Sequence, residues 1–187
     1  MTDLLLYLNA VSPLSPEAAD DFLKVFRPKT FAKGELLLRE GEVCHYYYYI
    51  KSGLTKSCFY NEDKEFIMRF FSENMMFTEF SSYVSQQPSK YMIQALEPTE
   101  VLLIKRADIE RLRQRHHSIE ALFSKLFSGV AMGMMRRISE MLEENATFRY
   151  ANFLHENRTL AQRISLRDLA SYLGITQVSL SRIRASK

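Results

Sequence analysis

The sequence has little cysteine and no long run of apolar residues. Its 187 residues contain two cysteines, Cys44 and Cys58, which stand apart from each other and from any cluster of histidines. This excludes a zinc finger and a cysteine-ligated iron–sulfur cluster as interpretations of the sequence. We expect both cysteines to be small buried side chains of a core.

Nothing in the sequence predicts contact with a membrane. No stretch approaches the roughly eighteen consecutive apolar residues that a membrane-spanning helix needs. The apolar Leu4-Leu5-Leu6 lacks a basic region before it and a cleavage site after it, so we do not interpret it as a signal peptide. We therefore expect a cytoplasmic protein.

The charge is small overall but unevenly distributed. The net charge is +3, and residues 158–187 contribute +5 of it because they hold six basic residues and a single acid, Asp168, which leaves −2 for the rest. The basic residues are Arg158, Arg163, Arg167, Arg182, Arg184 and Lys187. A basic end on a near-neutral body indicates a surface that binds a polyanion, although a solvated helix face would carry the same charge.

The sequence first predicts a helix, because Ser15, Pro16 and Glu17 suit a helix cap and first turn. Short strands follow it. From Thr30 to Ile104, β-branched, aromatic and leucine residues gather in runs of roughly four to eight that turn residues separate, which predicts a barrel or jelly roll. The main runs are Leu36–Leu38, Tyr46–Ile50, Leu54–Tyr60, Glu65–Phe71, Tyr91–Ala95 and Val101–Ile104. We interpret the Tyr46–Tyr49 run as strand packing, because consecutive strand residues face opposite ways.

From Ala107 to Glu144 the apolar period becomes helical. Apolar residues recur at steps of three and four with no proline between them, which predicts one helix about 55 Å long. One small barrel cannot cover such a helix, so we expect a second copy of the chain to cover its apolar stripe. Gly129 and Gly133 each lower the stability of the helix by about 1 kcal/mol relative to alanine. A close approach of another backbone, or a mild kink, would explain why glycine occurs at these positions.

Residues 165–184 predict two helices joined by a tight turn. Ser165 suits the first helix cap, with Asp168 three residues later as in a capping box. Gly174 suits a left-handed helix end and Thr176 the cap of the next helix. The inward positions are Leu166, Leu169, Ala170, Leu173, Ile175, Leu180 and Ile183. An ordinary helical hairpin shares part of this pattern, but the basic outer face favours a helix-turn-helix that binds DNA.

The outer face of the second helix supplies residues that can contact DNA. A recognition helix places its N-terminal residues on base edges in the major groove. Arg182 can bond a guanine bidentately and Gln177 an adenine, each worth about 1–3 kcal/mol of discrimination. Thr176, Ser179 and Lys187 suit phosphate contacts.

With these motifs, nearly the whole chain resembles the Crp/Fnr superfamily of dimeric transcriptional regulators. Lys33–Gly41 and Tyr48–Gly53 look like the glycine-marked turns of its cyclic-nucleotide-binding β-roll, and Phe77–Ser82 looks like its phosphate-binding cassette. Leu169–Arg184 is similar to the compact members common in Bacteroidetes. The resemblance implies an α+β fold: an N-terminal jelly-roll-like β-roll with flanking helices, a long dimerisation helix and a C-terminal helix-turn-helix domain.

The resemblance also implies boundaries and partners. The sensor β-roll would span residues 1–106, the dimerisation helix 107–144 and the helix-turn-helix domain 145–187. Such a protein is a homodimer and not an enzyme. It binds double-stranded DNA, acts with RNA polymerase and answers to a small-molecule effector.

The cassette departs from the family pattern. The family has glycine before the glutamate, where this chain has Thr78 before Glu79. The family arginine that grips the cyclic phosphate, with its hydroxyl neighbour, becomes Ser89 and Lys90 in a gapless alignment. Losing that arginine removes a charge-assisted bond of about 1.5–3 kcal/mol, or about ten- to a hundred-fold in affinity, and Lys90 lacks its bidentate fork.

Two further positions differ. In the same gapless alignment, the dimer-helix hydroxyls that meet adenine in the cyclic-AMP-binding members become Met134 and Met135. We therefore do not expect the chain to bind cyclic AMP, any other cofactor or a metal. An apolar or aromatic effector, or no effector at all, fits these residues better. Most compact members carry glutamate where this chain has Val178, which can only touch a methyl group or fill space, so the operator should differ.

Two other classes of protein stay open. A cupin-like metal-dependent enzyme would share the rolled β-architecture, but it needs clustered histidines with a carboxylate. Only His45 lies in the β-region, whereas His116, His117 and His155 lie in predicted helices. The second alternative is a sensor module that dimerises without binding DNA.

Overall fold

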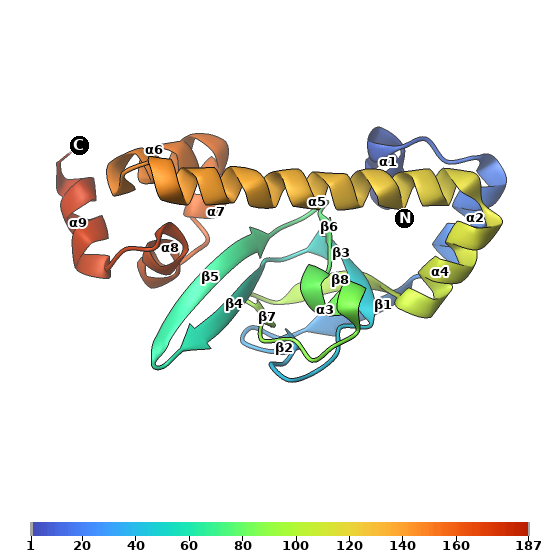
Figure 1. Ribbon diagram of the computed structural model, residues 1–187, viewed down its shortest axis with the longest axis horizontal. Helices are drawn as coiled ribbons and strands as arrows, with labels where there is room; N and C mark the ends of the chain where they lie inside the picture. The colour runs from blue at the N-terminus through green and yellow to red at the C-terminus, as the bar shows by residue number, and fades with distance from the viewer. Residues whose placement is uncertain (1, 187) are drawn as a thin grey trace.

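Two four-stranded antiparallel sheets form the N-terminal part of the computed structural model, which describes residues 2–186 (Figure 1). The first has the order β1 (Arg27–Phe31), β8 (Thr99–Lys105), β3 (Tyr46–Ser52) and β6 (Met76–Phe77). The second has the order β2 (Leu36–Leu38), β7 (Met92–Ala95), β4 (Thr55–Asn61) and β5 (Lys64–Phe71). The α+β fold and the β-roll expected from the sequence are confirmed, with β6 and the short helix α3 (Phe80–Ser85) as additions.

Two helices precede the β-roll, of which the sequence predicted only the second. Helix α1 (Thr2–Val11) buries Leu4 and Leu8 completely. Helix α2 (Pro16–Val25) begins as predicted, because the Ser15 side chain accepts a hydrogen bond from the backbone amide of Ala18. It ends at Val25, and Pro28 lies in the edge strand β1, where a proline is tolerated.

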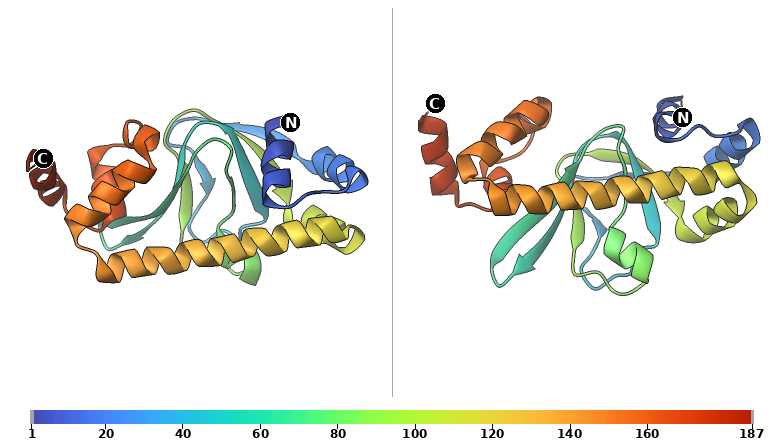
Figure 2. Two further views of the ribbon diagram at one scale, coloured as in Figure 1. Left: turned by 90° about the horizontal axis from the view of Figure 1, so that it is seen from above. Right: turned by 45° about the horizontal axis from the view of Figure 1, so that its top comes forward.

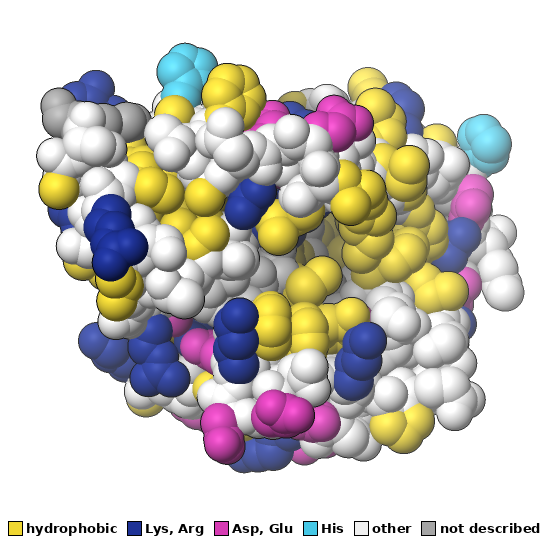
Figure 3. All heavy atoms as spheres, turned by 60° about the vertical axis from the view of Figure 1, so that its left-hand side comes forward, with side chains coloured by type: hydrophobic (Ala, Val, Ile, Leu, Met, Phe, Trp, Pro, Cys, Tyr) yellow, Lys and Arg dark blue, Asp and Glu magenta, His cyan; other side chains and the backbone are white. Residues whose placement is uncertain are grey.

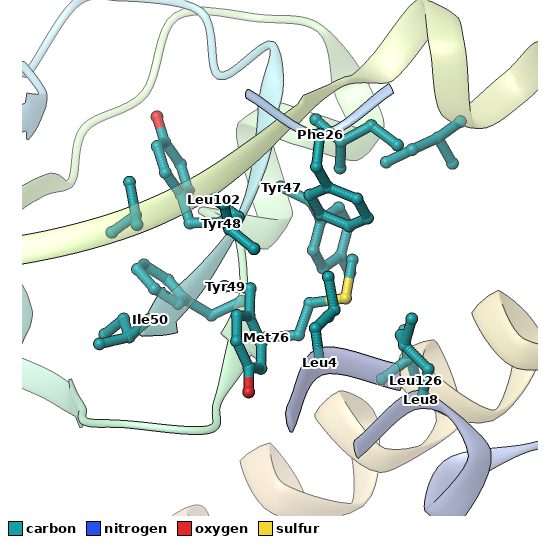
Figure 4. Close-up of a cluster of buried hydrophobic side chains, with 14 of the residues drawn as sticks. Leu4, Leu8, Phe26, Tyr47, Tyr48, Tyr49, Ile50, Met76, Leu102 and Leu126 are labelled. Carbon is teal, nitrogen blue, oxygen red and sulfur yellow. The ribbon is translucent and has the colours of Figure 1, made fainter. Parts of the chain in front are cut away.

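Strand β3 is buried on both of its faces. Tyr47, Tyr48 and Tyr49 are each at most 3% exposed. The ring of Tyr47 contacts Phe123 of the long helix, that of Tyr48 stacks on Phe77, and that of Tyr49 contacts Tyr7 of α1. Figure 4 shows these side chains extending from one strand toward different neighbours. The tyrosine run is therefore packing between the roll and the helices, as the sequence predicted.

The helix predicted over Ala107–Glu144 is broken, which corrects the sequence analysis. Helix α4 (Arg106–Arg115) and helix α5 (His117–Glu143) are separated by His116, whose backbone is extended at φ −126° and ψ 111°. The buried His116 ring places Nε2 3.1 Å from Asp21 Oδ2 of α2. This distant contact holds the turn, and α5 is about 40 Å long instead of 55 Å.

Helix α5 runs along the molecule from the N-terminal helices to the C-terminal ones (Figure 2). Its first half is packed on the roll through Ile119, Leu122, Phe123 and Leu126. Its second half leaves large apolar side chains exposed: Met132, Met134, Met135, Ile138, Met141 and Leu142. No helix among residues 2–186 has the length and apolar character to cross a membrane.

Four helices form the C-terminal part: α6 (Ala146–Glu156), α7 (Arg158–Ala161), α8 (Leu166–Leu173) and α9 (Gln177–Ala185). Asn145 caps α6 by accepting from the amide of Phe148. Helix α6 ends at Glu156, and after the single residue Asn157 the chain turns once more as α7.

These helices share a core with the β4–β5 hairpin. Leu54, Ile67 and Phe70 of the roll pack with buried residues of α6, α8 and α9: Tyr150, Phe153, Leu169, Ala170, Leu173 and Leu180. Cys58 lies in this shared core and Cys44 in the main core of the roll, and both are free and buried. Burial raises the pKa of the Cys58 thiol to about 12, so both cysteines act as the small core residues that were predicted.

A buried ion-pair cluster joins the two parts. Lys56 Nζ of β4 lies 2.6 Å from Glu65 Oε1 of β5 and 2.8 Å from Asp168 Oδ1 of α8. The Lys56 and Glu65 side chains are at most 7% exposed and that of Asp168 is 14% exposed. Burial acts to raise the pKa of Asp168, but the hydrogen bonds from Lys56 and Ser165 outweigh it and leave this pKa lowered.

A second cluster lies beside the first. Arg163, between α7 and α8, donates to Glu73 Oε1 and Oε2 at 2.8 Å each and to Glu97 Oε1 at 2.6 Å. Glu73 also accepts from the amide of Gly53, whose φ of +106° and close approach to the Thr99 backbone leave no room for a side chain. The hydrogen bonds from Arg163 lower the pKa of Glu73 to about 2, so this pair stays ionised at neutral pH.

The burial of α1 yields one test. Leu8→Ala should lower the free energy of unfolding by about 2–5 kcal/mol, because it removes a fully buried side chain and leaves a cavity. Leu6→Ala is the matched control, since Leu6 is 65% exposed on the same helix and should change stability by less than about 0.5 kcal/mol. Urea unfolding followed by circular dichroism measures both, and equal effects would show that α1 is not part of the core.

The buried ion pairs yield a second test. Lys56→Met should destabilise the chain by about 3–5 kcal/mol, because Glu65 and Asp168 would remain buried without their cation. Lys51→Met is the control, since the Lys51–Glu100 pair is about half exposed and should contribute at most about 1 kcal/mol. Limited proteolysis of residues 157–165 should speed up only in Lys56→Met, and unchanged cleavage there would contradict a role for Lys56 in docking.

Candidate nucleic-acid interface and sensor site

The turn between α8 and α9 has the local structure that the sequence predicted. Ser165 caps α8 by accepting from the amide of Asp168 at 3.0 Å. Gly174 ends α8 in the left-handed conformation at φ +70°, and the amide of Ile175 bonds back to the Ala170 carbonyl at 3.0 Å. A Cβ atom on Gly174 would lie 2.8 Å from Met141 Cε, the end of a flexible side chain of α5 that can shift, so it is the left-handed φ that favours glycine here.

The predicted capping box is only half formed. In a complete box the acidic side chain would bond to the amide of Ser165. Here the Asp168 carboxylate accepts from the Ser165 hydroxyl at 2.5 Å and pairs with Lys56 at 2.8 Å. The single acid of the basic C-terminal end therefore has a partner in the roll, 112 residues away in sequence.

Helix α9 presents one face to solvent. Gln177, Val178 and Arg182 are exposed, Val178 to 60%, and none of their side chains has a hydrogen bond or ion pair within residues 2–186. Leu180 is fully buried on the opposite side. Three of the predicted reading positions are thus accessible to a large partner.

The other predicted contacts are placed differently. Thr176 Oγ1 accepts from the amide of Ser179 at 3.1 Å, and the two hydroxyls lie 2.9 Å apart, so both belong to the helix cap. Lys187 lies outside the described residues. Leu166, assigned to the apolar face of α8 from the sequence, is 49% exposed, and that assignment is wrong.

The polar groups of the cassette are bonded within the chain. The Thr78 hydroxyl donates to the Tyr46 carbonyl at 2.7 Å. The Glu79 carboxylate caps α3 by accepting from the amides of Ser81 and Ser82. Ser89 Oγ exchanges two hydrogen bonds of 2.9 Å with the Tyr91 backbone. All three side chains are therefore hydrogen-bonded to the backbone of the chain itself.

Aromatic rings surround the rest of the cassette. The ammonium of Lys90 lies over the rings of Phe59 and Tyr91, 5.8 and 5.2 Å from their centroids. Phe77, the first residue of the cassette, stacks on Phe71 with centroids 4.1 Å apart. Lys90 therefore has a local partner of its own in the two rings.

The two methionines of the predicted pocket lie on the exposed part of α5. Met134 is 48% exposed and Met135 is 65% exposed. Neither belongs to the buried core of the β-roll or to the side chains packed against it. Within one chain, the structure does not place them over the cassette.

One group of potential metal ligands occurs in residues 2–186. The ligand atoms of Glu17, Asp21 and His116 lie within 4.8 Å of one another where α2 meets the α4–α5 junction. Arg115 contacts both carboxylates, at 3.2 Å to Glu17 and 3.1 Å to Asp21, which makes the group an ion-pair network. His45, in the β-region, is exposed and bonded to Gln86, so this arrangement does not resemble a cupin centre.

Comparison with known proteins places the roll in a family. Residues 28–116 match the family model described as the cyclic nucleotide-binding domain. No curated protein sequence matches the chain.

Solved structures match over most of the chain. FixK2 from Bradyrhizobium japonicum has a TM-score of 0.76 at 23% identity, covering 87% of this chain and 84% of its own. The c-di-GMP responsive global regulator CLP of Xanthomonas campestris has a TM-score of 0.72 at 16% identity, with 92% and 91% covered. A CooA mutant from Carboxydothermus hydrogenoformans has a TM-score of 0.71 at 19% identity, with 88% and 77% covered. Residues 28–116 are therefore similar to the cyclic nucleotide-binding domain, and the chain has the fold of the Crp/Fnr transcriptional regulators.

Proposed function

We propose that this chain is a homodimeric, DNA-binding transcription regulator whose sensor domain does not use cyclic AMP. The observation that carries the proposal is the exposed face of α9, because it leaves the hydrogen-bonding groups of Gln177 and Arg182 free at the end of a capped helix-turn-helix. RNA polymerase is the expected partner of such a regulator on DNA.

The α9 geometry supports a division of roles between bases and phosphates. Arg182 and Gln177 suit direct contacts with guanine and adenine edges in the major groove. Of the two bonded hydroxyls of Thr176 and Ser179, only one can donate to the other, so one hydroxyl hydrogen stays available for a phosphate oxygen. Val178 would contribute a methyl contact or fill space.

The exposed half of α5 supports a homodimer. Met134, Met135, Ile138, Met141 and Leu142 recur at steps of three, four and seven and so share one side of the helix. A contiguous apolar stripe of this kind indicates an interface, and a second copy of the same helix is the partner that symmetry favours. Met134 and Met135 would then pack against the partner helix.

The cassette supports a sensor without cyclic AMP. A hydroxyl of a cyclic nucleotide would have to compete for Glu79, and its phosphate for Ser89, with hydrogen bonds that both side chains already form within the chain. The fold itself does not specify a ligand: one similar structure is titled c-di-GMP responsive and another, CprK, is complexed with OCPA. An effector of this chain would therefore be another small molecule.

Selection from random double-stranded DNA tests the DNA-binding proposal. We expect a two-fold symmetric sequence to be enriched, and the same sequence with and without cyclic AMP. Arg182→Ala should weaken binding to it by about 5- to 150-fold, equivalent to about 1–3 kcal/mol.

Arg184→Ala is the matched control for charge. Arg184 lines a cavity with Tyr150 and Leu154 on the other side of α9, so its loss should weaken all sequences modestly and alike. The proposal fails if no sequence is enriched, or if Arg182→Ala leaves binding to the selected DNA intact. Enrichment that requires cyclic AMP would contradict the sensor assignment alone.

The oligomeric state tests the second part of the proposal. The chain should be a dimer at about 10 μM by light scattering, and Met135→Glu should make it monomeric by burying a charge in the interface. Leu6→Glu is the control, because Leu6 is equally exposed at 65% but lies on α1. A monomeric wild-type chain, or a dimer that survives Met135→Glu, would show that α5 is not the interface.

A further inference from the structure

A cavity of about 350 Å³ lies where the roll, the long helix and the C-terminal helices meet. One wall comes from β5 and the turn after it, a second from residues 133–140 of α5, and a third from residues 153–160 with Tyr172. None of the predicted cassette residues lines it. Figure 3, which views the molecule from the side of the C-terminal helices, shows a surface hollowed between hydrophobic and basic side chains.

The charged side chains of this cavity are mostly arginines. Its lining holds four arginines and two glutamates: Arg69, Arg136, Arg137, Arg158, Glu140 and Glu156. Arg137 already has partners, since it lies 3.5 Å from Glu140, donates to the Tyr172 carbonyl and covers the Tyr172 ring at 4.1 Å from its centroid. The other three arginines exceed the one remaining glutamate by two charges.

Arg69, Arg136 and Arg158 have no ion pair within the described part of the chain. They come from β5, α5 and α7, so elements of both domains bring them to one cavity. Elsewhere at this junction the cations are neutralised, Lys56 by two carboxylates and Arg163 by two more. All three are exposed, and Arg69 also lies over the Phe71 ring at 5.8 Å from its centroid, so water screens the repulsion between their charges, and a bound anion would lower it further.

Gly133 leaves space beside α5 for the Arg69 side chain. A Cβ atom at position 133 would lie 3.3 Å from Arg69 Nη1, closer than ordinary contact, although no atom lies within 4 Å of the same point at Gly129. An alanine at position 133 would therefore displace the Arg69 guanidinium by only a few tenths of an ångström.

The cavity does not compete with the proposed dimer interface. Positions 133, 136, 137 and 140 form pairs three and four residues apart and share one side of α5. The exposed positions 134, 135, 138, 141 and 142 share the other side, because 3.6 residues make one turn. A second copy on the apolar side would leave the cavity open.

We propose that this cavity binds a small dianion of the phosphate-ester type. Guanidinium groups match phosphate oxygens with two parallel hydrogen bonds, and the nearby rings of Phe70, Phe153 and Tyr172 can accommodate an apolar or planar group on the same molecule. Its volume lies at the lower end of the range of about 300–1,000 Å³ for small-molecule sites. A dianion there touches both domains and stabilises their docked arrangement. The site is independent of whether α9 binds DNA.

Calorimetric titration of the full chain with inorganic pyrophosphate at low ionic strength tests the site. We expect one pyrophosphate per chain. Arg69→Gln combined with Arg158→Gln should raise Kd at least about tenfold, because each arginine supplies charge-assisted hydrogen bonds. Arg39→Gln combined with Arg111→Gln is the matched control, since these exposed arginines also remove two charges but line other surfaces, and Kd should change less than about twofold.

A separate measurement tests whether the bound anion bridges the two domains. Pyrophosphate should slow proteolysis of residues 157–165 in the wild-type chain and not in the cavity variant. The proposal is wrong if the wild-type chain binds no pyrophosphate, if the cavity variant binds it unchanged, or if the control variant loses it equally. If the wild-type chain binds no pyrophosphate and the cavity variant also loses affinity for DNA, the proposal is wrong and the arginines contact the DNA backbone instead.

Discussion

One lysine and two carboxylates, removed from water together, determine how the two halves of this protein sit. Lys56 and Glu65 come from the β4–β5 hairpin and Asp168 from α8. Such a group adds little stability compared with apolar residues of the same size, but it is costly to break, because any separation leaves buried charges without partners. The hairpin and α8 therefore meet in one register, which also places Arg163 beside Glu73 and Glu97.

This docking makes it costly to separate the C-terminal helices from the roll. To swing away from the roll, they must return Lys56, Asp168 and Arg163 to water and uncover the core that Phe70 and Leu169 share. Intermediate positions would lose the ion pairs without regaining full hydration, so small displacements are disfavoured. A signal that opens the interface has to supply the whole difference in free energy between the two arrangements.

Local features of the fold could be predicted from the sequence, and distant ones could not. The caps at Ser15, Ser165 and Thr176 and the left-handed Gly174 depend on residues within four positions, so their chemistry is visible in the sequence. The strands were predictable for the same reason. Helix α1 shows only three adjacent leucines and no cap, and what holds it is the core that Leu4 and Leu8 enter.

The same distinction explains the errors at α5 and in the sites. The break at His116 depends on Asp21, 95 residues earlier, and the half-formed capping box depends on Lys56, 112 residues away from Asp168. For the candidate sites, sequence reasoning identified the exposed residues of α9. It could not show that the polar side chains of the cassette form their hydrogen bonds within the chain, or that arginines from three elements line one cavity.

The contact between α5 and the α8–α9 turn has a mechanical consequence. The Met141 side chain of α5 contacts Gly174, and Arg137, one turn earlier on α5, donates a hydrogen bond to the Tyr172 carbonyl. The long helix is thus linked to the turn by a side-chain contact and by a hydrogen bond. A rotation or slide of α5 would break these contacts unless the start of α9, with the exposed side chains of Gln177 and Arg182, moved with it.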